Sequence, residues 1–322
     1  MTHLGEVLVV VPALNEQRHI VNCLESILRD APGLTVVVAD GGSTDETRAL
    51  VAGLAQRFPN LQIIDNPARL QSAGINRAVA ACATPAHRIL VRCDAHAGYP
   101  PGFVRAVARA LDHHKAASVV VPMDSTGQTA FARAAAWVVD TPLGSGGSAH
   151  RGGRMSGPVD HGHHAGMDLG WFRQIGGYDP GFSHNEDAEY DHRLRLVGGA
   201  IWMQSDIRLD YVMRPTFRTL ARQYWNYGRG RARTVLKHRM RPKLRQLIPA
   251  VNLVGMILAL VVALVWPWAL LWPLAYGVAL LGVSLVGAQR IGLGGLCAGP
   301  ALLAMHNFWA AGFLWQIGRA GR

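Results

Sequence analysis

The sequence predicts an α/β protein with an open, mostly parallel sheet, helices on both faces of that sheet and transmembrane helices toward its C-terminus. Short apolar runs alternate with amphipathic stretches from residue 6 to residue 197, as expected when strands are buried on both faces. Two runs without any charged residue follow, at residues 248–289 and 291–318. Charge is also divided along the chain, because all 21 Asp and Glu residues lie at or before Asp210.

Five apolar runs are predicted to be strands of one sheet. Residues 6–11 form a continuous apolar run, which is typical of a strand buried in a parallel sheet. Runs of the same character occur at residues 35–39, 61–65, 88–93 and 118–122. Their alternation with helical stretches indicates crossover connections, and therefore parallel pairing.

The segments between these strands are predicted to be helices. Residues 16–29 place their apolar side chains on one helical face. The next helix is expected to begin at Ser43, since Glu46 follows three residues later as in a capping box. Further helices are expected at residues 72–82, after Pro101 and at residues 186–197. The Gly- and Ser-rich residues 124–165 have weak periodicity and are expected to form active-site loops.

The distribution of charge favours a membrane over nucleic acid as the partner of the basic part. The formal net charge is +11, but residues 1–210 carry −3 and residues 211–322 carry +14. Residues 208–245 hold twelve Lys and Arg and a single acid. Positive residues that flank a membrane span stay in the cytoplasm, so we expect residues 1–246 on that side and no nucleic-acid partner.

Polar residues follow three of the predicted strands, where open α/β sheets bind their ligands. They are Pro12, Asn15 and Glu16 after the first strand, Asp40 and Asp45 after the second, and Asp94 and His96 after the fourth. No GxGxxG follows the first strand, and no GxxxxGK[ST] occurs. These absences argue against a dinucleotide site and exclude a P-loop NTPase.

Two short acidic motifs suggest chemistry. A carboxylate and an imidazole, at Asp94 and His96, suit Mg²⁺ or Mn²⁺ with substrate phosphates as further ligands. The alternative is a capped turn with an exposed histidine. Glu186 and Asp187 begin a predicted helix, where a carboxylate could serve as general base toward an attacking sugar hydroxyl. The alternative is that both only complement the helix dipole.

Two further polar clusters are less specific. His161, His163 and His164 have spacing that could bind zinc, but no Cys or fourth His is near them. We therefore expect a polar loop that lines a cleft. Residues 222–233 interleave Arg with aromatic residues, which suits a lipid-linked diphosphate. Their charge could instead serve only the positive-inside rule.

In this order the motifs VVVPALNE, ADGGSTDET, DAH, NED and QYWNYGRGR resemble the family 2 glycosyltransferases. RCDAHAGYP, GGYDPGFSHNEDAEYDHRLR and YGRGRART look most like the ExoA-type enzymes of succinoglycan, an exopolysaccharide. The resemblance implies a GT-A fold, the Rossmann-like fold of nucleotide-diphospho-sugar transferases. It also implies a metal-dependent, inverting hexosyltransferase that moves glucose from UDP-glucose onto a saccharide on a polyprenyl diphosphate.

The resemblance assigns residues to the donor site. Pro12, Asn15, Glu16 and Asp40 would hold the uracil and ribose, while Asp45, Arg69, Ala73 and Asn76 would line the rest of the nucleotide pocket. Asp94 would bind the metal, Mg²⁺ or Mn²⁺, and the diphosphate, with His96 as the partner ligand. The usual motif in this family is D-x-D, so D-x-H is a departure that lowers the local negative charge.

The resemblance also assigns the reacting and closing groups. Asp187 would be the general base, supported by Glu186. Gln223 and Trp225 would close over the donor diphosphate. Asn226 stands where many relatives have the Arg of Q-x-x-R-W, and the charge would come from Arg229 or Arg231.

Together these features predict three regions. Residues 1–212 would be a cytosolic GT-A catalytic domain, residues 213–247 basic juxtamembrane helices, and residues 248–318 about three transmembrane segments in a bacterial inner membrane. The last segment would either span the membrane or be re-entrant. Two alternative functions fit less well. A processive polysaccharide synthase would need more membrane spans, and a non-enzymatic membrane nucleotide-sugar-binding protein would not need the acidic pair Glu186 and Asp187.

Overall fold

The computed structural model describes residues 4–29, 33–147 and 153–320. It divides into two compact units, one formed by residues 1–123 and 153–210 and the other by residues 124–152 and 211–322. The expectation of loops over residues 124–165 is wrong. The described residues of that segment include the helices α5 (Ala130–Val139) and α6 (Pro142–Ser145), both in the second unit.

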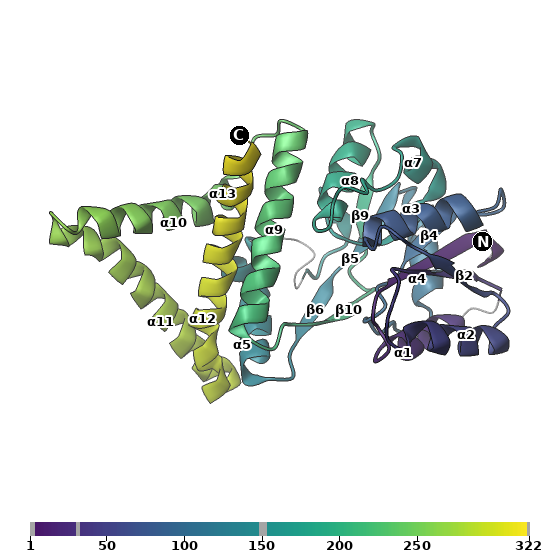
Figure 1. Cartoon of the computed structure of the whole chain (residues 1–322), viewed down its shortest axis with the longest axis horizontal. Coiled ribbons are helices and arrows are strands. Elements are labelled where there is room, and N and C mark those ends of the chain that lie inside the picture. The colour runs from purple at the N-terminus through teal and green to yellow at the C-terminus, as the bar shows by residue number, and fades with distance from the viewer. Residues whose placement is uncertain (1–3, 30–32, 148–152, 321–322) are drawn as a thin grey trace. The chain divides into compact units, whose positions relative to one another are not determined.

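The first unit contains an eight-stranded sheet with the order β3-β2-β1-β4-β8-β5-β9-β7 (Figure 1). Its strands are β1 (Val7–Ala13), β2 (Thr35–Asp40), β3 (Leu61–Asp65), β4 (Ile89–Arg92), β5 (Ser118–Val121), β7 (Gly157–Pro158), β8 (His163–Asp168) and β9 (Ile201–Met203). The five predicted strands are confirmed. The sheet is mostly parallel, but β8 enters it antiparallel to both β4 and β5.

Helices cover both faces of this sheet, as predicted. Val7, Val9 and Val11 point into one core, whereas Leu8 and Val10 point into the other, since side chains alternate along a strand. The first core also holds α1 (Ile20–Leu28), α2 (Thr47–Arg57) and α4 (Phe103–His114). The second holds α3 (Gln71–Cys82), α7 (Leu169–Gln174) and α8 (Glu186–Leu196).

The predicted capping box of α2 does not form. The N-cap of this helix is Glu46, which makes no side-chain capping bond. The Ser43 hydroxyl instead donates to Asp40 Oδ1 at 2.6 Å. Residues 41–46 therefore form a loop beyond β2, and that loop is stabilised by the buried Asp40.

In the second unit, α9 (Phe217–Lys237) packs closely against α13 (Trp309–Ala320). Glycine allows the close approach at two points. A Cβ added to Gly228 would lie 2.0 Å from the carbonyl oxygen of Trp309, and one added to Gly312 would lie 2.2 Å from that of Trp225. A separate strand pair is formed by β6 (Met123–Thr126) and β10 (Leu209–Val212).

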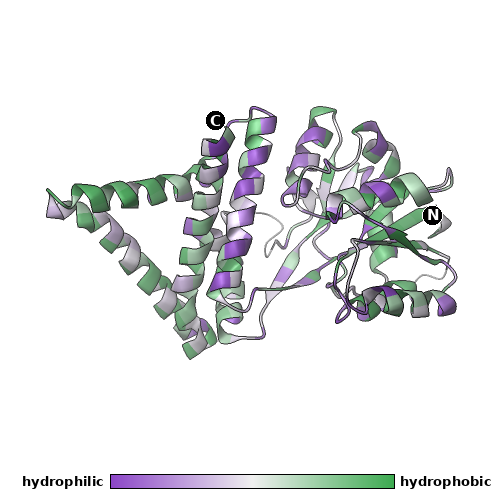
Figure 2. Ribbon diagram, in the orientation of Figure 1, coloured by the Kyte–Doolittle hydropathy of each residue, from purple (hydrophilic) through white to green (hydrophobic). Residues whose placement is uncertain are grey.

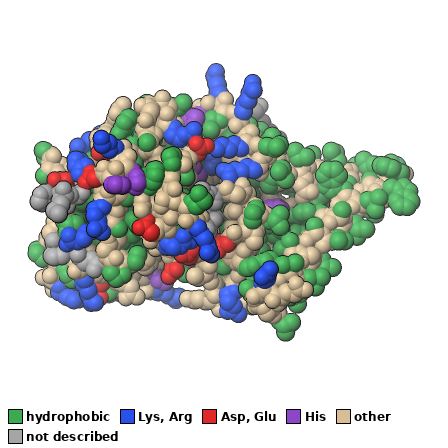
Figure 3. Space-filling model, turned by 180° about the vertical axis from the view of Figure 1, so that it is seen from behind, with side chains coloured by type: hydrophobic (Ala, Val, Ile, Leu, Met, Phe, Trp, Pro, Cys, Tyr) green, Lys and Arg blue, Asp and Glu red, His purple; other side chains and the backbone are tan. Residues whose placement is uncertain are grey.

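Two apolar segments of the second unit are long enough to cross a membrane. They are α10 (Leu244–Val262) and the stretch Pro267–Ile291, which contains α11 (Leu271–Ile291). Figure 2 shows both segments to be mainly hydrophobic, and many of their large apolar side chains are exposed on the surface (Figure 3). Within the described part of the chain no third helix meets the same criteria. The last expected segment is divided among a 3₁₀ helix (Leu293–Cys297), α12 (Ala298–Leu303), a π-helix (Ala304–Phe308) and α13.

Candidate active site

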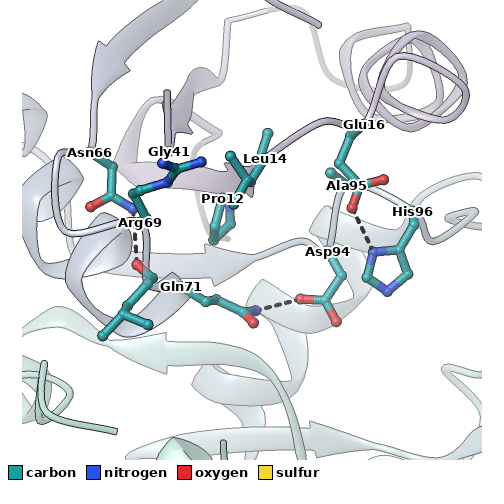
Figure 4. A pocket seen from close by; sticks show the side chains of 12 residues that line it. Pro12, Leu14, Glu16, Gly41, Asn66, Arg69, Gln71, Asp94, Ala95 and His96 are labelled. Atoms are coloured by element: carbon teal, nitrogen blue, oxygen red, sulfur yellow. Dashed lines mark hydrogen bonds and ion pairs between the residues drawn. The ribbon is translucent and has the colours of Figure 1, made fainter. Parts of the chain in front are cut away.

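A pocket lies at the carboxyl ends of β1, β2, β3 and β4 (Figure 4). The predicted residues that line it are Pro12, Glu16, Arg69, Asp94 and His96. Its other lining residues are Ala13, Leu14, Gly41, Asn66, Leu70, Gln71 and Ala95. The structure thus brings together groups that follow four neighbouring strands, at the carboxyl ends where α/β folds bind ligands.

Three of the predicted nucleotide-site residues shape the loops beside this pocket. Asn15, whose φ is 57°, accepts a bond from the Thr44 amide at 2.8 Å. Asp40 is buried and accepts from Arg48 Nη1 at 2.8 Å. Although burial opposes its charge, the bonds from Ser43 and Arg48 hold the pKa of Asp40 below its usual value. Asp45 accepts from the Thr47 amide at 3.0 Å.

Two further predicted residues lie on α3. Asn76 uses both ends of its side-chain amide on Tyr178, donating to the carbonyl at 2.7 Å and accepting from the amide at 2.9 Å. Ala73 is half-buried on the same helix. Neither is among the residues that line the pocket, so Asn76 acts here on the backbone that leads to the acidic helix α8.

Asp94 is oriented by two donors on one side. Its Oδ1 accepts from Gln71 Nε2 at 2.7 Å (Figure 4) and lies 3.4 Å from both Nε and Nη2 of Arg92. Its Oδ2 lies 3.7 Å from Nε2 of His163. Burial opposes the charge of Asp94, but Arg92 first, and His163 and His96 next, hold its pKa well below the usual value.

Arg92 connects this carboxylate to the acidic pair on α8. Its side chain is only 5% exposed, and it contacts Asp94, Glu186 and Asp187 together. The Arg92–Asp187 contact is made through Nη1 and Oδ1. A buried guanidinium needs such partners to remain charged, and these carboxylates raise its pKa well above the usual value despite burial.

Glu186 and Asp187 differ in protonation although they are neighbours. Both begin α8, after Asn185 in the left-handed region at φ 62°. Burial, and then the charge of Asp187, raise the pKa of Glu186 to about 7. Burial also opposes the charge of Asp187, but Arg92 and then His164 keep its pKa below the usual value. Asp187 is therefore ionised at neutral pH, whereas Glu186 is about half protonated there.

A buried histidine–aspartate cluster lies behind Asp187. Asp191, one turn further along α8, is 2.8 Å from His161 Nδ1 and 2.7 Å from His164 Nε2. The other nitrogen of His164 is 2.5 Å from the Tyr178 hydroxyl and 3.7 Å from Asp187 Oδ1. His163 and His164 lie on β8, so the expectation that they belong to a loop is wrong.

The chemistry of the Asp94 site fits a hard divalent ion, with a carboxylate and imidazole nitrogens as its ligand types. Across residues 4–29, 33–147 and 153–320, no cluster of three or more His, Cys, Asp or Glu could hold an ion. Mg²⁺ sites in proteins commonly combine one or two carboxylates with water and substrate phosphates.

The sequence profile of glycosyl transferase family 2 matches residues 8–176. Succinoglycan biosynthesis protein ExoA of Rhizobium meliloti (strain 1021) is 41% identical over 317 residues, which cover 95% of this chain and 93% of that protein. The chain belongs to glycosyl transferase family 2. The predicted resemblance to ExoA-type enzymes is thereby confirmed.

Solved structures agree with the fold of this glycosyltransferase. A mannosyltransferase from Pyrobaculum calidifontis, solved in complex with GDP-Man and Mn²⁺, has a TM-score of 0.61 at 18% identity, and the match covers 96% of this chain and 87% of that one. TarS 1-349 of S. aureus has a TM-score of 0.50 at 15% identity and covers 98% and 92%. At these identities the likeness supports the GT-A fold alone.

The remaining predicted residues of the glycosyltransferase lie on α9, in the second unit. Gln223 Nε2 donates to the hydroxyls of Tyr211 at 2.6 Å and Tyr227 at 2.9 Å. The Trp225 and Trp315 rings are 5.9 Å apart, and the Arg229 guanidinium lies 4.7 Å from the centre of the Trp315 ring. Arg231 is half-buried on the same helix.

Sequence reasoning missed Arg92, Gln71 and Asp191. Arg92 had a detectable signal, because a charged residue within an apolar strand must find buried partners. Asp191 follows Asp187 by four residues, the spacing of one helical face. Gln71 carried no comparable signal, since an amide at the start of a helix is common on protein surfaces.

Proposed function

We propose that this glycosyltransferase moves glucose from UDP-glucose onto a saccharide carried by a polyprenyl diphosphate, in exopolysaccharide biosynthesis. It would act on the cytoplasmic side of a bacterial inner membrane and invert the anomeric configuration. The likeness to ExoA over nearly the full length of both chains supports the pathway class. The bound GDP-Man of the Pyrobaculum enzyme supports a nucleotide-sugar donor.

The observation that carries the proposal is the contact of Arg92 with both Asp94 and Asp187. Asp94 lies at the donor pocket, and Asp187 lies at the start of α8. The buried guanidinium of Arg92 therefore fixes the position of Asp94, which would bind the donor, relative to Asp187, which could accept a proton. A transferase needs these two groups on either side of the reacting carbon.

The oxygen of the acceptor hydroxyl would bond to the anomeric carbon of the donor while the bond from that carbon to UDP breaks. Asp187 would take the proton that this hydroxyl loses. One displacement of this kind inverts the configuration. Asp187 suits the step because Arg92 keeps it ionised at neutral pH, and its place on α8 limits its movement. Glu186, with a pKa of about 7, would support Asp187.

Asp94 would hold Mg²⁺ or Mn²⁺, with a histidine and the donor diphosphate as its other ligands. When bound, such an ion neutralises negative charge on a leaving diphosphate. Pro12, Glu16 and Arg69 line the pocket that would take the nucleotide. Asn15, Asp40, Asp45, Ala73 and Asn76 would complete the nucleotide site, mainly through the loops they stabilise.

The second unit would bind the membrane and the lipid acceptor. The two apolar helical segments are long enough to span a bilayer. Arg229 and Arg319 both lie over the Trp315 ring, at 4.7 and 5.3 Å. Arginine beside an aromatic surface suits a diphosphate that is attached to an apolar chain. Gln223, Trp225 and Arg231 would contribute to the same diphosphate-binding surface.

A donor screen tests this proposal. The full-length chain in nanodiscs would be given a polyprenyl-diphosphate saccharide, Mn²⁺ and, in separate reactions, UDP-glucose, UDP-galactose or GDP-mannose. Acceptor-dependent release of the nucleotide would be measured. We expect UDP-glucose to give the fastest release and EDTA to stop it. Nucleotide release from none of the donors would refute the proposal, and a faster GDP-mannose reaction would refute the donor assignment.

A further inference from the structure

We propose that His163, on β8, is the imidazole that binds the divalent ion together with Asp94. This inference rests on the proposed function, which places an ion and the donor diphosphate at Asp94. The D-x-H motif suggests His96 as the nitrogen ligand, and this inference replaces it with His163. His163 is 69 positions away from Asp94 in the sequence, so only the sheet brings the two together.

The pairing of β4 with β8 explains why these side chains meet. The two strands are antiparallel, with Ile89 opposite Asp168 and Val91 opposite Gly166. Asp94 lies two residues beyond the end of β4, and His163 is the first residue of β8. Antiparallel pairing therefore brings the two residues to the same end of the strand pair. There, Asp94 Oδ2 lies 3.7 Å from His163 Nε2.

The separation of these atoms suits shared ligation of an ion better than a direct bond. At 3.7 Å, Nε2 and Oδ2 are too far apart for a good hydrogen bond. Two atoms that each bind one ion at about 2.1 Å lie between roughly 3.0 Å and 4.2 Å apart, depending on the angle at the metal. The two side chains can therefore bind one ion without movement of either strand.

Neighbouring groups leave Asp94 with one oxygen directed at His163. Its Oδ1 is held by Gln71 Nε2 at 2.7 Å and by Arg92 at 3.4 Å. These contacts prevent the carboxylate from rotating, so Oδ2 faces β8. Ligating carboxylates are commonly oriented by hydrogen bonds of this kind to their second oxygen.

His96 is less well placed for the same role. Its side chain is 56% exposed, compared with 14% for His163. Its Nδ1 lies 3.3 Å from Glu16 Oε1, and Figure 4 shows the ring turned toward that carboxylate at the rim of the pocket. His96 is therefore placed to contact the donor or Glu16, whereas His163 lies on the sheet and faces the carboxylate of Asp94.

An irregularity in β8 accompanies this arrangement. The register between β5 and β8 shifts between Val119 and Val120, which pair with Gly166 and His164. β8 therefore contains one residue, Ala165, that has no counterpart on β5. Bulges of this type re-aim side chains next to active sites. The consecutive histidines consequently serve different carboxylates, with His163 at Asp94 and His164 at Asp187 and Asp191.

The test detects the nitrogen ligand directly. The full-length chain in detergent, saturated with UDP, would be titrated with Mn²⁺ and studied by electron spin echo envelope modulation, which reports ¹⁴N bonded to Mn²⁺. Variants would be His163→Ala, His163→Gln and, as the matched control, His96→Ala. Thermal unfolding of each variant would show that it is folded, and the Gln variant fills the space left by the ring.

We expect the ¹⁴N coupling in the wild type and in His96→Ala, and its loss in both His163 variants. Mn²⁺ should bind more than about 10-fold more weakly to the His163 variants and within about 3-fold of wild type to His96→Ala. Persistence of the coupling in a His163 variant would overturn the inference and leave the proposed function standing. A wild type that binds no Mn²⁺ with UDP would instead refute the metal-dependent function itself.

Discussion

Arg92 is the residue on which the geometry of the site depends most. It is buried, and it contacts Asp94 on one side and Glu186 and Asp187 on the other. Removing one partner from a buried ionic cluster costs about 3–5 kcal/mol, because the remaining charges lose their compensation. Arg92 therefore both stabilises the first unit and sets the separation of Asp94 and Asp187, the two carboxylates to which we propose functional roles.

The role of Asp187 leads to a prediction at the same scale. Asp187→Asn keeps the shape of the side chain but removes its capacity to accept a proton. We expect sugar transfer to fall by more than about 10²-fold, while UDP affinity stays within about 3-fold of wild type. Transfer is measured by acceptor-dependent UDP release and affinity by calorimetry. The exposed Asp206→Asn is the control, and near-normal turnover of Asp187→Asn would exclude Asp187 as the base.

Glu186 should make stability depend on pH. Its pKa rises from 4.5 to about 7 on folding, so the folded state holds this proton more tightly than the unfolded state. Stability should therefore fall as pH rises from about 4.5 to about 7. Glu186→Gln, which mimics the protonated form, should unfold at a higher temperature than wild type at pH 8 and at a similar temperature at pH 5.

This is checked by following intrinsic fluorescence during heating, in the same detergent at each pH. Glu46→Gln is the control, because Glu46 is exposed. The same loss of stability between pH 5 and pH 8 in Glu186→Gln as in wild type would contradict the assignment of the titration to Glu186.

Local sequence predicted some residues of the site and not others. Asp94 and Asp187 stand in short motifs at strand and helix ends, where ligand groups are expected, and both lie at the site. The capping box at Ser43 was predicted from an equally short pattern, but Asp40 takes the serine hydroxyl. A short motif does not say which of two nearby partners a side chain will choose.

At the scale of elements, β8 and α5 were not foreseen. α5 is buried at most positions, at Ala132, Ala134, Ala135, Ala136, Val138 and Val139, but Gly and Ser residues flank it in the sequence and favour a loop prediction. β8 begins with two histidines and needs Gly166, where a Cβ would lie 2.4 Å from Val107. Its insertion between β4 and β5 is a non-local property that no local pattern encodes.

The glycine contacts between α9 and α13 give a prediction for these elements. Gly228→Ala puts a methyl group 2.0 Å from the carbonyl oxygen of Trp309, which forces the two helices apart. We expect the apparent Tm of the second unit to fall by at least about 3 °C. Gly277→Ala is the matched control, because a Cβ there meets nothing within 4 Å and alanine favours a helix.

Heating the two variants side by side in one detergent checks this prediction, with Trp fluorescence as the signal for the second unit. An unchanged or raised apparent Tm for Gly228→Ala would show that α9 and α13 are not held together by this contact. A matching loss in Gly277→Ala would show that the effect does not depend on close packing.

At the scale of the whole molecule, net charge differs between the part of the chain that holds the pocket and the part that holds the apolar helices. Residues 1–210 carry −3 and hold the sheet and the pocket, whereas residues 211–322 carry +14 and hold both apolar helical segments. A basic region next to apolar helices favours cytoplasmic retention of the first unit. The overall charge of +11 alone would have pointed equally to nucleic acid.

The proposed spanning hairpin can be tested by chemical labelling. Val265, between the two apolar segments, is 87% exposed. If both segments cross the membrane, Val265→Cys should react with a membrane-impermeant maleimide in intact spheroplasts. Arg57→Cys in the first unit should react only after lysis, and the wild-type chain gives the background of its own cysteines. Labelling of Val265→Cys only after lysis would contradict a spanning hairpin.

The central claim is that the chain transfers a sugar to a lipid-linked acceptor by one direct displacement. The full-length chain in nanodiscs would be given ¹³C1-labelled UDP-glucose and a polyprenyl-diphosphate saccharide. The measurement is the anomeric configuration of the product, determined from the one-bond carbon–proton coupling at the labelled carbon. The account predicts a β-linked glucose from the α-linked donor. An α-linked product, or no transfer to the lipid acceptor, would contradict it.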